Sequence, residues 1–127
     1  MRGLLDTSVF IAGERERPLA SGQLPDEAAI SVVTLAELEL GVHMAASETA
    51  RGQRLRTLQA ARSTYVAIAI DESVASSFAE LVAIARREGR RPKVQDAWIA
   101  ATAHALGVAV YTQDSDFDEL AVDVVRV

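Results

Sequence analysis

Residues 95–120 read QDAWIAATAHALGVAVYTQDSDFDEL, a helical pattern followed by a glycine, an apolar run and a cluster of acids. Apolar residues recur at helical spacing up to Leu106, and Gly107 is the residue type that most often ends a helix. The next five residues, VAVYT at 108–112, have the composition of a buried strand. A helix that runs through a glycine into a buried strand is typical of an α/β protein.

The same alternation extends outward from this unit. Apolar runs predict four further strands, at residues 3–5, 28–32, 66–70 and 122–127. Helical patterns separate them, at residues 35–46, 48–62 and 72–88. Thr34 and Asp71 are the predicted capping residues of two of these helices. Because strands separated by helices form a parallel sheet with right-handed crossovers, we expect one α/β domain over residues 1–127.

The composition excludes several classes of protein. Half of the residues are hydrophobic but only 5% are aromatic, so Ala, Val, Leu and Ile must build the core, which suits helices packed on buried parallel strands. The chain has no cysteine, which excludes a disulfide scaffold and thiolate metal sites. No apolar run approaches the roughly 20 residues of a membrane helix, so we expect a cytoplasmic protein without a membrane partner.

Two acids follow predicted strands, at the edge of the sheet where ligands bind in parallel α/β proteins. Asp6 follows the first strand directly, and Asp114 follows the fourth strand by one Gln. Glu37 lies in the first turn after the second strand, and Asp96 begins the helix that precedes the fourth. Each also has a plainer interpretation: Asp6 as a helix cap, Asp96 as a first-turn acid, and residues 114–119 as a solvated turn.

The four acids together predict a metal site better than any one of them does. Glu37 interrupts a predicted apolar stripe on its helix that includes Val33, Leu40 and Met44. Four carboxylates that converged within about 6 Å would repel by roughly 3 kcal/mol per pair at an effective dielectric near 20. A divalent cation removes that conflict. An all-oxygen set of ligands without Cys or His selects hard ions such as Mg²⁺ or Mn²⁺.

Four segments carry these acids, LLDTSVFIA, SVVTLAELELG, QDAWIAATAHALG and YTQDSDFDEL. In this order they resemble the PIN-domain ribonucleases, and among them the VapC-type toxins of bacterial toxin–antitoxin pairs. The resemblance spans almost the whole chain and implies a PIN-like three-layer α/β/α sandwich with a central, mainly parallel five-stranded sheet. It also implies the site residues: catalytic Asp6, Glu37, Asp96 and Asp114, with Asp6, Asp96 and Asp114 binding the metal and Thr112 and Asp116 supporting them.

The function implied by this resemblance is a Mg²⁺- or Mn²⁺-dependent endoribonuclease that acts as the toxin of a VapBC-type pair. Glu37 would orient or deprotonate the attacking water, or else bind metal. The expected partners are an RNA substrate, a cognate VapB-type antitoxin that covers the groove near the acids, and a second copy of the chain in a homodimer. The net charge is −5, so some arginines of residues 51–62 and 86–93 should line the approach of the RNA.

Two other functions stay open. A receiver-like phosphoacceptor signalling domain would use Asp71 as its acceptor, but it needs an acidic pair after the first strand and a lysine near the end of the fifth. Here Asp6 stands alone and Lys93 is the only lysine. A catalytically inactive PIN-like binding module would share the fold without the chemistry, whereas all four acids are present.

Overall fold

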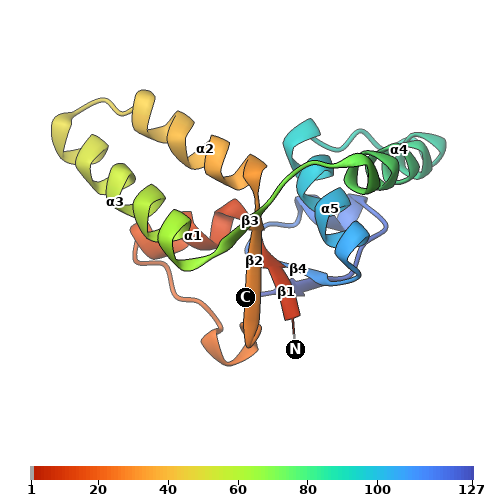
Figure 1. Ribbon diagram of the computed structural model, residues 1–127, viewed down its shortest axis with the longest axis horizontal. Helices are drawn as coiled ribbons and strands as arrows, with labels where there is room; N and C mark the ends of the chain where they lie inside the picture. Colours follow the sequence, from red (N-terminus) through yellow and green to blue (C-terminus); the bar gives the residue numbers. More distant parts are fainter. Residues whose placement is uncertain (1) are drawn as a thin grey trace.

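The computed structural model describes residues 2–127 and contains a five-stranded sheet between two layers of helices (Figure 1). The strands are β1 Arg2–Leu5, β2 Glu27–Ser31, β3 Val66–Ile68, β4 Ala109–Thr112 and β5 Val124–Arg126. They lie in the order β3-β2-β1-β4-β5, and each neighbouring pair is parallel. The expected α/β/α sandwich around a parallel sheet is therefore confirmed.

The helices form two groups, one on each face of the sheet (Figure 1). One group comprises α1 Thr7–Glu14, α2 Val32–His43 and α3 Glu48–Thr64. The other comprises α4 Glu72–Arg87 and α5 Val94–Leu106. Two short 3₁₀ turns also occur, η1 Ser21–Gln23 and η2 Asp116–Glu119. Within residues 2–127, no helix is both long enough and apolar enough to cross a membrane.

The sheet is buried on both faces, as a parallel sheet requires. Leu4 of β1 belongs to a core with Leu81 of α4 and Ile99 of α5. Its neighbour Leu5 belongs to a separate core that includes Leu58 of α3. Successive residues of a strand point to opposite faces, so β1 supplies one leucine to each core. Burial on both faces explains why the strands read as continuous apolar runs.

Capping chemistry predicted two helix ends correctly, the start of α4 and the end of α5, and misplaced the cap of α2. Asp71 caps α4 through a 2.9 Å hydrogen bond from a backbone N–H, and Gly107 ends α5 with a φ of 70°. The prediction that Thr34 caps α2 is wrong, because the helix starts earlier and the hydroxyl of Ser31 caps it at 3.0 Å. Glu37 consequently lies in the second turn of α2 and not in the first.

The predicted apolar stripe around Glu37 is also wrong. Leu40 and Met44 are 60% and 71% exposed, whereas Leu38 and Val42 are buried. Two apolar rows lie side by side on α2, and its packing against α3 and the sheet decides which row is covered. Glu37 therefore does not interrupt a buried face.

The strand order bears against the receiver-like alternative. Receiver domains of this size have the order 2-1-3-4-5, with the third strand inside the sheet, whereas β3 lies at an edge here. Asp71 follows that edge strand, is exposed, and serves as the cap of α4. Neither the strand order nor the position of Asp71 therefore fits a phosphoacceptor domain.

Candidate functional site

A hollow of about 220 Å³ lies beyond the carboxyl ends of β1 and β4. Leu5 of β1 pairs in register with Tyr111 of β4, so the residues that follow the two strands lie together. The hollow is lined by the four acids that the sequence analysis singled out, Asp6, Glu37, Asp96 and Asp114. Residues up to 108 positions apart in the chain thus meet at one end of the sheet.

Asp6 is both a helix cap and part of the wall of this hollow. It is 3% exposed and accepts a hydrogen bond at Oδ2 from the backbone N–H of Ser8, at 3.3 Å, which caps α1. The hydroxyl of Thr112 donates to the same oxygen at 2.9 Å. Both bonds fall on Oδ2 and neither uses Oδ1, so capping does not compete with a second role for Asp6.

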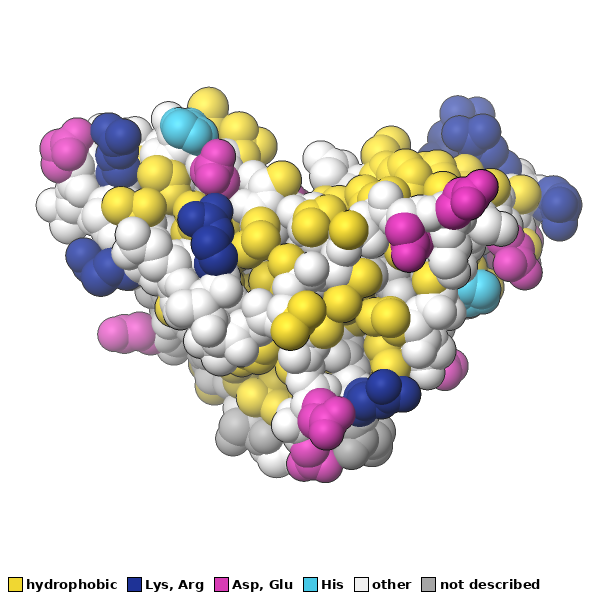
Figure 2. Space-filling model, in the orientation of Figure 1, with side chains coloured by type: hydrophobic (Ala, Val, Ile, Leu, Met, Phe, Trp, Pro, Cys, Tyr) yellow, Lys and Arg dark blue, Asp and Glu magenta, His cyan; other side chains and the backbone are white. Residues whose placement is uncertain are grey.

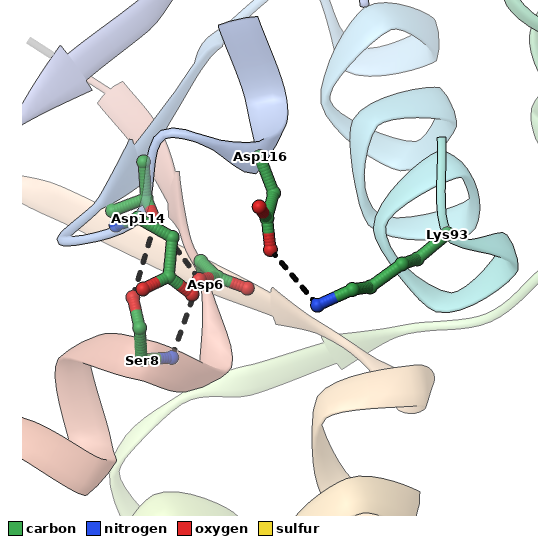
Figure 3. Close-up of polar contacts among 6 residues, drawn as sticks. Asp6, Ser8, Lys93, Asp114 and Asp116 are labelled. Atoms are coloured by element: carbon green, nitrogen blue, oxygen red, sulfur yellow. Dashed lines mark hydrogen bonds and ion pairs between the residues drawn. The ribbon is translucent and has the colours of Figure 1, made fainter. Parts of the chain in front are cut away.

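Two hydroxyls tie the end of β1 to the end of β4. Ser8 Oγ lies 3.1 Å from Thr112 Oγ1 and accepts from the N–H of Gln113 at 3.0 Å. Since Thr112 gives its only hydroxyl hydrogen to Asp6, Ser8 is the donor between the two hydroxyls. Thr112 also accepts from the N–H of Asp114 at 2.9 Å. Figure 3 shows Asp6, Ser8 and Asp114 grouped in this way. The residues D-T-S after the first strand are a capping signal that includes Ser8, but nothing in the sequence indicated its bonds to Thr112 and Gln113.

Glu37 reaches the hollow from α2 and is held there by α1. The hydroxyl of Thr7 donates to Glu37 Oε1 at 2.8 Å and lies 3.0 Å from the hydroxyl of the fully buried Thr34. Burial raises the pKa of Glu37, the hydrogen bond from Thr7 partly offsets that rise, and the charges of Asp6 and Asp114 add to it. Glu37 is thus a fixed carboxylate with more affinity for a proton than an exposed one.

Asp96 lies in the first turn of α5, as predicted, and the helix begins at Val94, one residue before the expected start near Gln95. Burial, followed by the negative charges of Asp6, Asp116 and Glu37, raises the pKa of Asp96 to about 6. Its Oδ2 atom is buried and has no hydrogen-bond partner among residues 2–127. A buried carboxylate oxygen without a partner is unfavourable, so this atom calls for a group that the chain itself does not supply.

The hollow carries an excess of negative charge that fits a hard divalent cation. Burial also raises the pKa of Asp6, so three of the lining acids favour a proton when no cation is bound. The donor atoms are all oxygen, as Mg²⁺ and Mn²⁺ prefer. Among residues 2–127, no three acidic or histidine side chains already stand in position to hold an ion together. A bound ion would have to draw the carboxylates inward, against the repulsion that separates them.

Asp116 and Asp118, which follow Asp114 in the chain, form ion pairs and do not line the hollow. Asp116 Oδ2 lies 3.2 Å from Lys93 Nζ at the start of α5 (Figure 3). Asp118 pairs with Arg126 at 3.0 Å. Asp116 is expected to support the metal, but in this structure its carboxylate pairs with Lys93 instead. Neither pair left a signal in the sequence, because the partners come from separate elements.

Known proteins resemble this chain over nearly its whole length. The family model described as PIN domain matches residues 3–123. Ribonuclease VapC5 of Mycobacterium tuberculosis is 43% identical over 129 residues, with 98% of this chain and 95% of that protein covered. Ribonuclease VapC4 of the same organism is 44% identical, with 91% of this chain and 88% of that protein covered.

Solved structures show the same likeness. The crystal structure of VapBC-5, a toxin–antitoxin system member from Mycobacterium tuberculosis, matches with a TM-score of 0.91 and 40% identity, covering 99% of this chain and 98% of that one. VapBC2 from Rickettsia felis, bound to a DNA fragment from its promoter, matches with a TM-score of 0.85 and 20% identity, covering 100% and 99%. At that identity the second match is evidence for the fold alone. The expected PIN-like fold is confirmed.

Proposed function

The chain belongs to the PIN-domain family, and from that premise we propose that it is a metal-dependent endoribonuclease, the toxin of a VapBC-type toxin–antitoxin pair. The observation that supports this most is the meeting of four carboxylates in one hollow, one of which has a buried oxygen with no hydrogen-bond partner in residues 2–127. The names of the relatives support the same activity and the same substrate class, RNA.

Within this proposal Asp6, Asp96 and Asp114 bind Mg²⁺ or Mn²⁺. When bound, such an ion lowers the pKa of a coordinated water and stabilises negative charge on the scissile phosphate. Glu37 receives the proton of the attacking water, for which a carboxylate with a raised pKa is suited. As the water oxygen bonds to phosphorus, one ester P–O bond breaks, and the leaving oxygen takes a proton from solvent.

The hydroxyls around the acids act as positioning groups. Thr7 holds Glu37, and Thr112 holds Asp6 and the backbone of Asp114. Preorganised donors of this kind keep reacting groups in place without reorganisation during the reaction. Asp116 stands at the rim with Lys93 and is proposed to affect metal affinity more than the chemical step.

The partners follow from the same proposal. Structures titled as VapBC toxin–antitoxin systems align over almost the whole chain, which supports a VapB-type antitoxin as partner in the cytoplasm. Figure 2 shows hydrophobic side chains gathered around the notch between the α2–α3 pair and α4. Leu40, Met44, Val66 and Val94 are among the exposed large hydrophobic residues. Such surface is typical of a covered interface, either with the antitoxin or with a second copy of the chain in a homodimer.

The test is cleavage of a labelled single-stranded RNA by the purified protein, with Mg²⁺ or Mn²⁺ and with EDTA. Asp114→Asn is expected to lower turnover by about 100-fold or more, as loss of an electrostatic contact in the transition state commonly does. The matched control is Asp118→Asn, which lies in the same stretch but pairs with Arg126 and should cleave like the wild type. Asp116→Asn should fall between them and recover at high metal concentration.

Two results would count against the proposal. Full activity in all three variants would remove this stretch from the site. RNA that is bound but never cleaved by the wild type with either metal would favour the catalytically inactive PIN-like binding module.

A further inference from the structure

A second hollow of about 220 Å³ adjoins the acidic one. The two share Ile11 and Glu37 in their walls, so Glu37 stands at the boundary between them. Arg15 and Arg54 line the second hollow, and Arg17 lines the acidic one. A continuous surface therefore leads from the other three carboxylates, past Glu37, to Arg15 and Arg54. We call the hollow lined by Arg15 and Arg54 the arginine groove.

These three arginines have no ionic partner in the part of the chain that the structure describes. Within residues 2–127, no carboxylate lies within ion-pair distance of Arg15, Arg17 or Arg54. By contrast, Arg62 and Arg90 each pair with a glutamate, at 3.5 Å. Cations left unpaired beside an acidic site, in a chain with a net charge of −5, are available to an anionic ligand.

The wall that carries Arg54 is fastened to its neighbours. Arg54 Nη1 donates to the carbonyl oxygen of Gly41 in α2 at 2.7 Å, which fixes the guanidinium on that side. Glu14 also lines the groove, but its Oε2 accepts from the hydroxyl of Thr57 at 2.9 Å. Gln53 donates to the carbonyl oxygen of Glu14 at 3.0 Å. Helix α3 is thus tied to α1 and α2, and the groove is a fixed feature of the fold.

We propose that the arginine groove binds a phosphate of the RNA strand next to the scissile one, while Arg17 faces the scissile phosphate from the wall of the acidic hollow. This inference rests on the proposed ribonuclease function. Four carboxylates repel a polyanion, so substrate affinity must come from cations beside them. Arginine suits the task, because its planar guanidinium stays charged and bonds phosphate through two N–H groups.

The assignment differs from the simplest expectation for the arginine-rich segments. Arg54 comes from residues 51–62, as expected, whereas Arg15 and Arg17 belong to neither segment. Arg90 and Arg91, which do, are absent from the walls of both hollows. Replacement of Arg90 and Arg91 removes the same charge as replacement of Arg15 and Arg54, and so provides a matched control.

The experiment measures the affinity of a fluorescent 12-nucleotide single-stranded RNA against salt concentration, in EDTA so that no cleavage occurs. Each lost phosphate contact should reduce the slope of log affinity against log salt by about 0.7, so Arg15→Ala/Arg54→Ala should lose about 1.4. Arg90→Ala/Arg91→Ala should keep the slope of the wild type. Equal losses in both double variants, or no loss in either, would overturn the groove.

Further variants separate the remaining explanations. Because Arg54 also bonds to Gly41, melting temperatures are compared, and Arg15→Ala alone should lose about 0.7 of the slope without that bond. If Arg15→Ala/Arg54→Ala loses binding to polyglutamate but keeps the wild-type salt dependence of RNA affinity, the groove binds an acidic peptide and the proposal is wrong. If the wild type cleaves RNA and the arginine variants bind RNA as tightly as the wild type, the proposal for the arginine groove is refuted and the ribonuclease function stands. If RNA binding depends on these arginines but the wild type does not cleave RNA, the proposed ribonuclease function is refuted and the arginine groove stands.

Discussion

Replacing Asp96 by Asn is expected to stabilise the metal-free protein at neutral pH. An acid in the first turn of a helix is normally favourable, so an ordinary first-turn residue would give the opposite result. Asp96 differs because its Oδ2 is buried with no partner among the described residues, and because burial and the charges of three other acids raise its pKa. Asparagine keeps the size of the side chain and removes the charge.

The sign and size follow from proton linkage. The pKa of Asp96 rises from 3.8 to about 6 on folding, so the folded state binds this proton more tightly than the unfolded state does. The penalty for ionised Asp96 is absent below about pH 4, grows as the pH rises through about 6, and is complete at about pH 7. The rise corresponds to at most about 3 kcal/mol. Because the side chain is only half-buried, solvent screening reduces this to about 1–2 kcal/mol.

The assay is urea unfolding in EDTA at a series of pH values between about 4 and 7. Asp96→Asn should gain stability over the wild type as the pH rises, and the two should converge near pH 4. Glu72→Gln is the matched control, because Glu72 is an exposed acid in the first turn of α4 and should lose a few tenths of a kcal/mol. Added Mg²⁺ should raise the melting temperature of the wild type more than that of Asp96→Asn. Loss of stability in Asp96→Asn at every pH would make Asp96 an ordinary first-turn acid.

Two further substitutions test how the strands hold the site. Thr112→Val should lower the free energy of unfolding by about 1–3 kcal/mol and slow RNA cleavage, because Asp6 loses a 2.9 Å hydrogen bond. Thr112→Ser keeps the hydroxyl and should cleave RNA like the wild type. Equal cleavage rates for the two variants would exclude a positioning role for Thr112. Gly3→Ala should cost about 1–3 kcal/mol, because its new Cβ would meet the ring of Tyr111, whereas Gly13→Ala in α1 meets nothing within 4 Å and should be neutral or slightly stabilising. Equal melting temperatures for the two glycine variants would contradict the packing of β1 against β4.

Local chemistry made the strands, the helices and two of the acids predictable. Asp6 and Asp114 follow apolar runs directly, and the rule that ligands bind beyond parallel strands places them at one edge. Glu37 and Asp96 lie on helices, so their convergence depends on the strand order β2-β1-β4, which periodicity does not specify. The presence of four acids together and the resemblance to PIN-domain proteins were both needed to include them in the predicted site.

The failures of prediction have a common cause in tertiary packing. Two apolar rows on α2 look alike in the sequence, and only contact with α3 and the sheet buries Leu38 while leaving Leu40 exposed. The pair between Lys93 and Asp116 joins elements 23 residues apart, and Arg17 enters the wall of the hollow from a loop. Such long-range contacts have no periodic signature.

The central claim is that Asp6, Asp96 and Asp114 hold a divalent ion in the hollow beyond β1 and β4. Anomalous diffraction from crystals of the protein grown with Mn²⁺ tests it most directly. The account predicts a Mn²⁺ peak within about 2.0–2.3 Å of carboxylate oxygens from these residues, with Asp96 Oδ2 turned toward the ion, and no peak there in Asp114→Asn at the same Mn²⁺ concentration. A Mn²⁺ peak at another place in the protein would contradict the claim. So would the absence of Mn²⁺ from the hollow if the protein cleaves RNA at the same Mn²⁺ concentration.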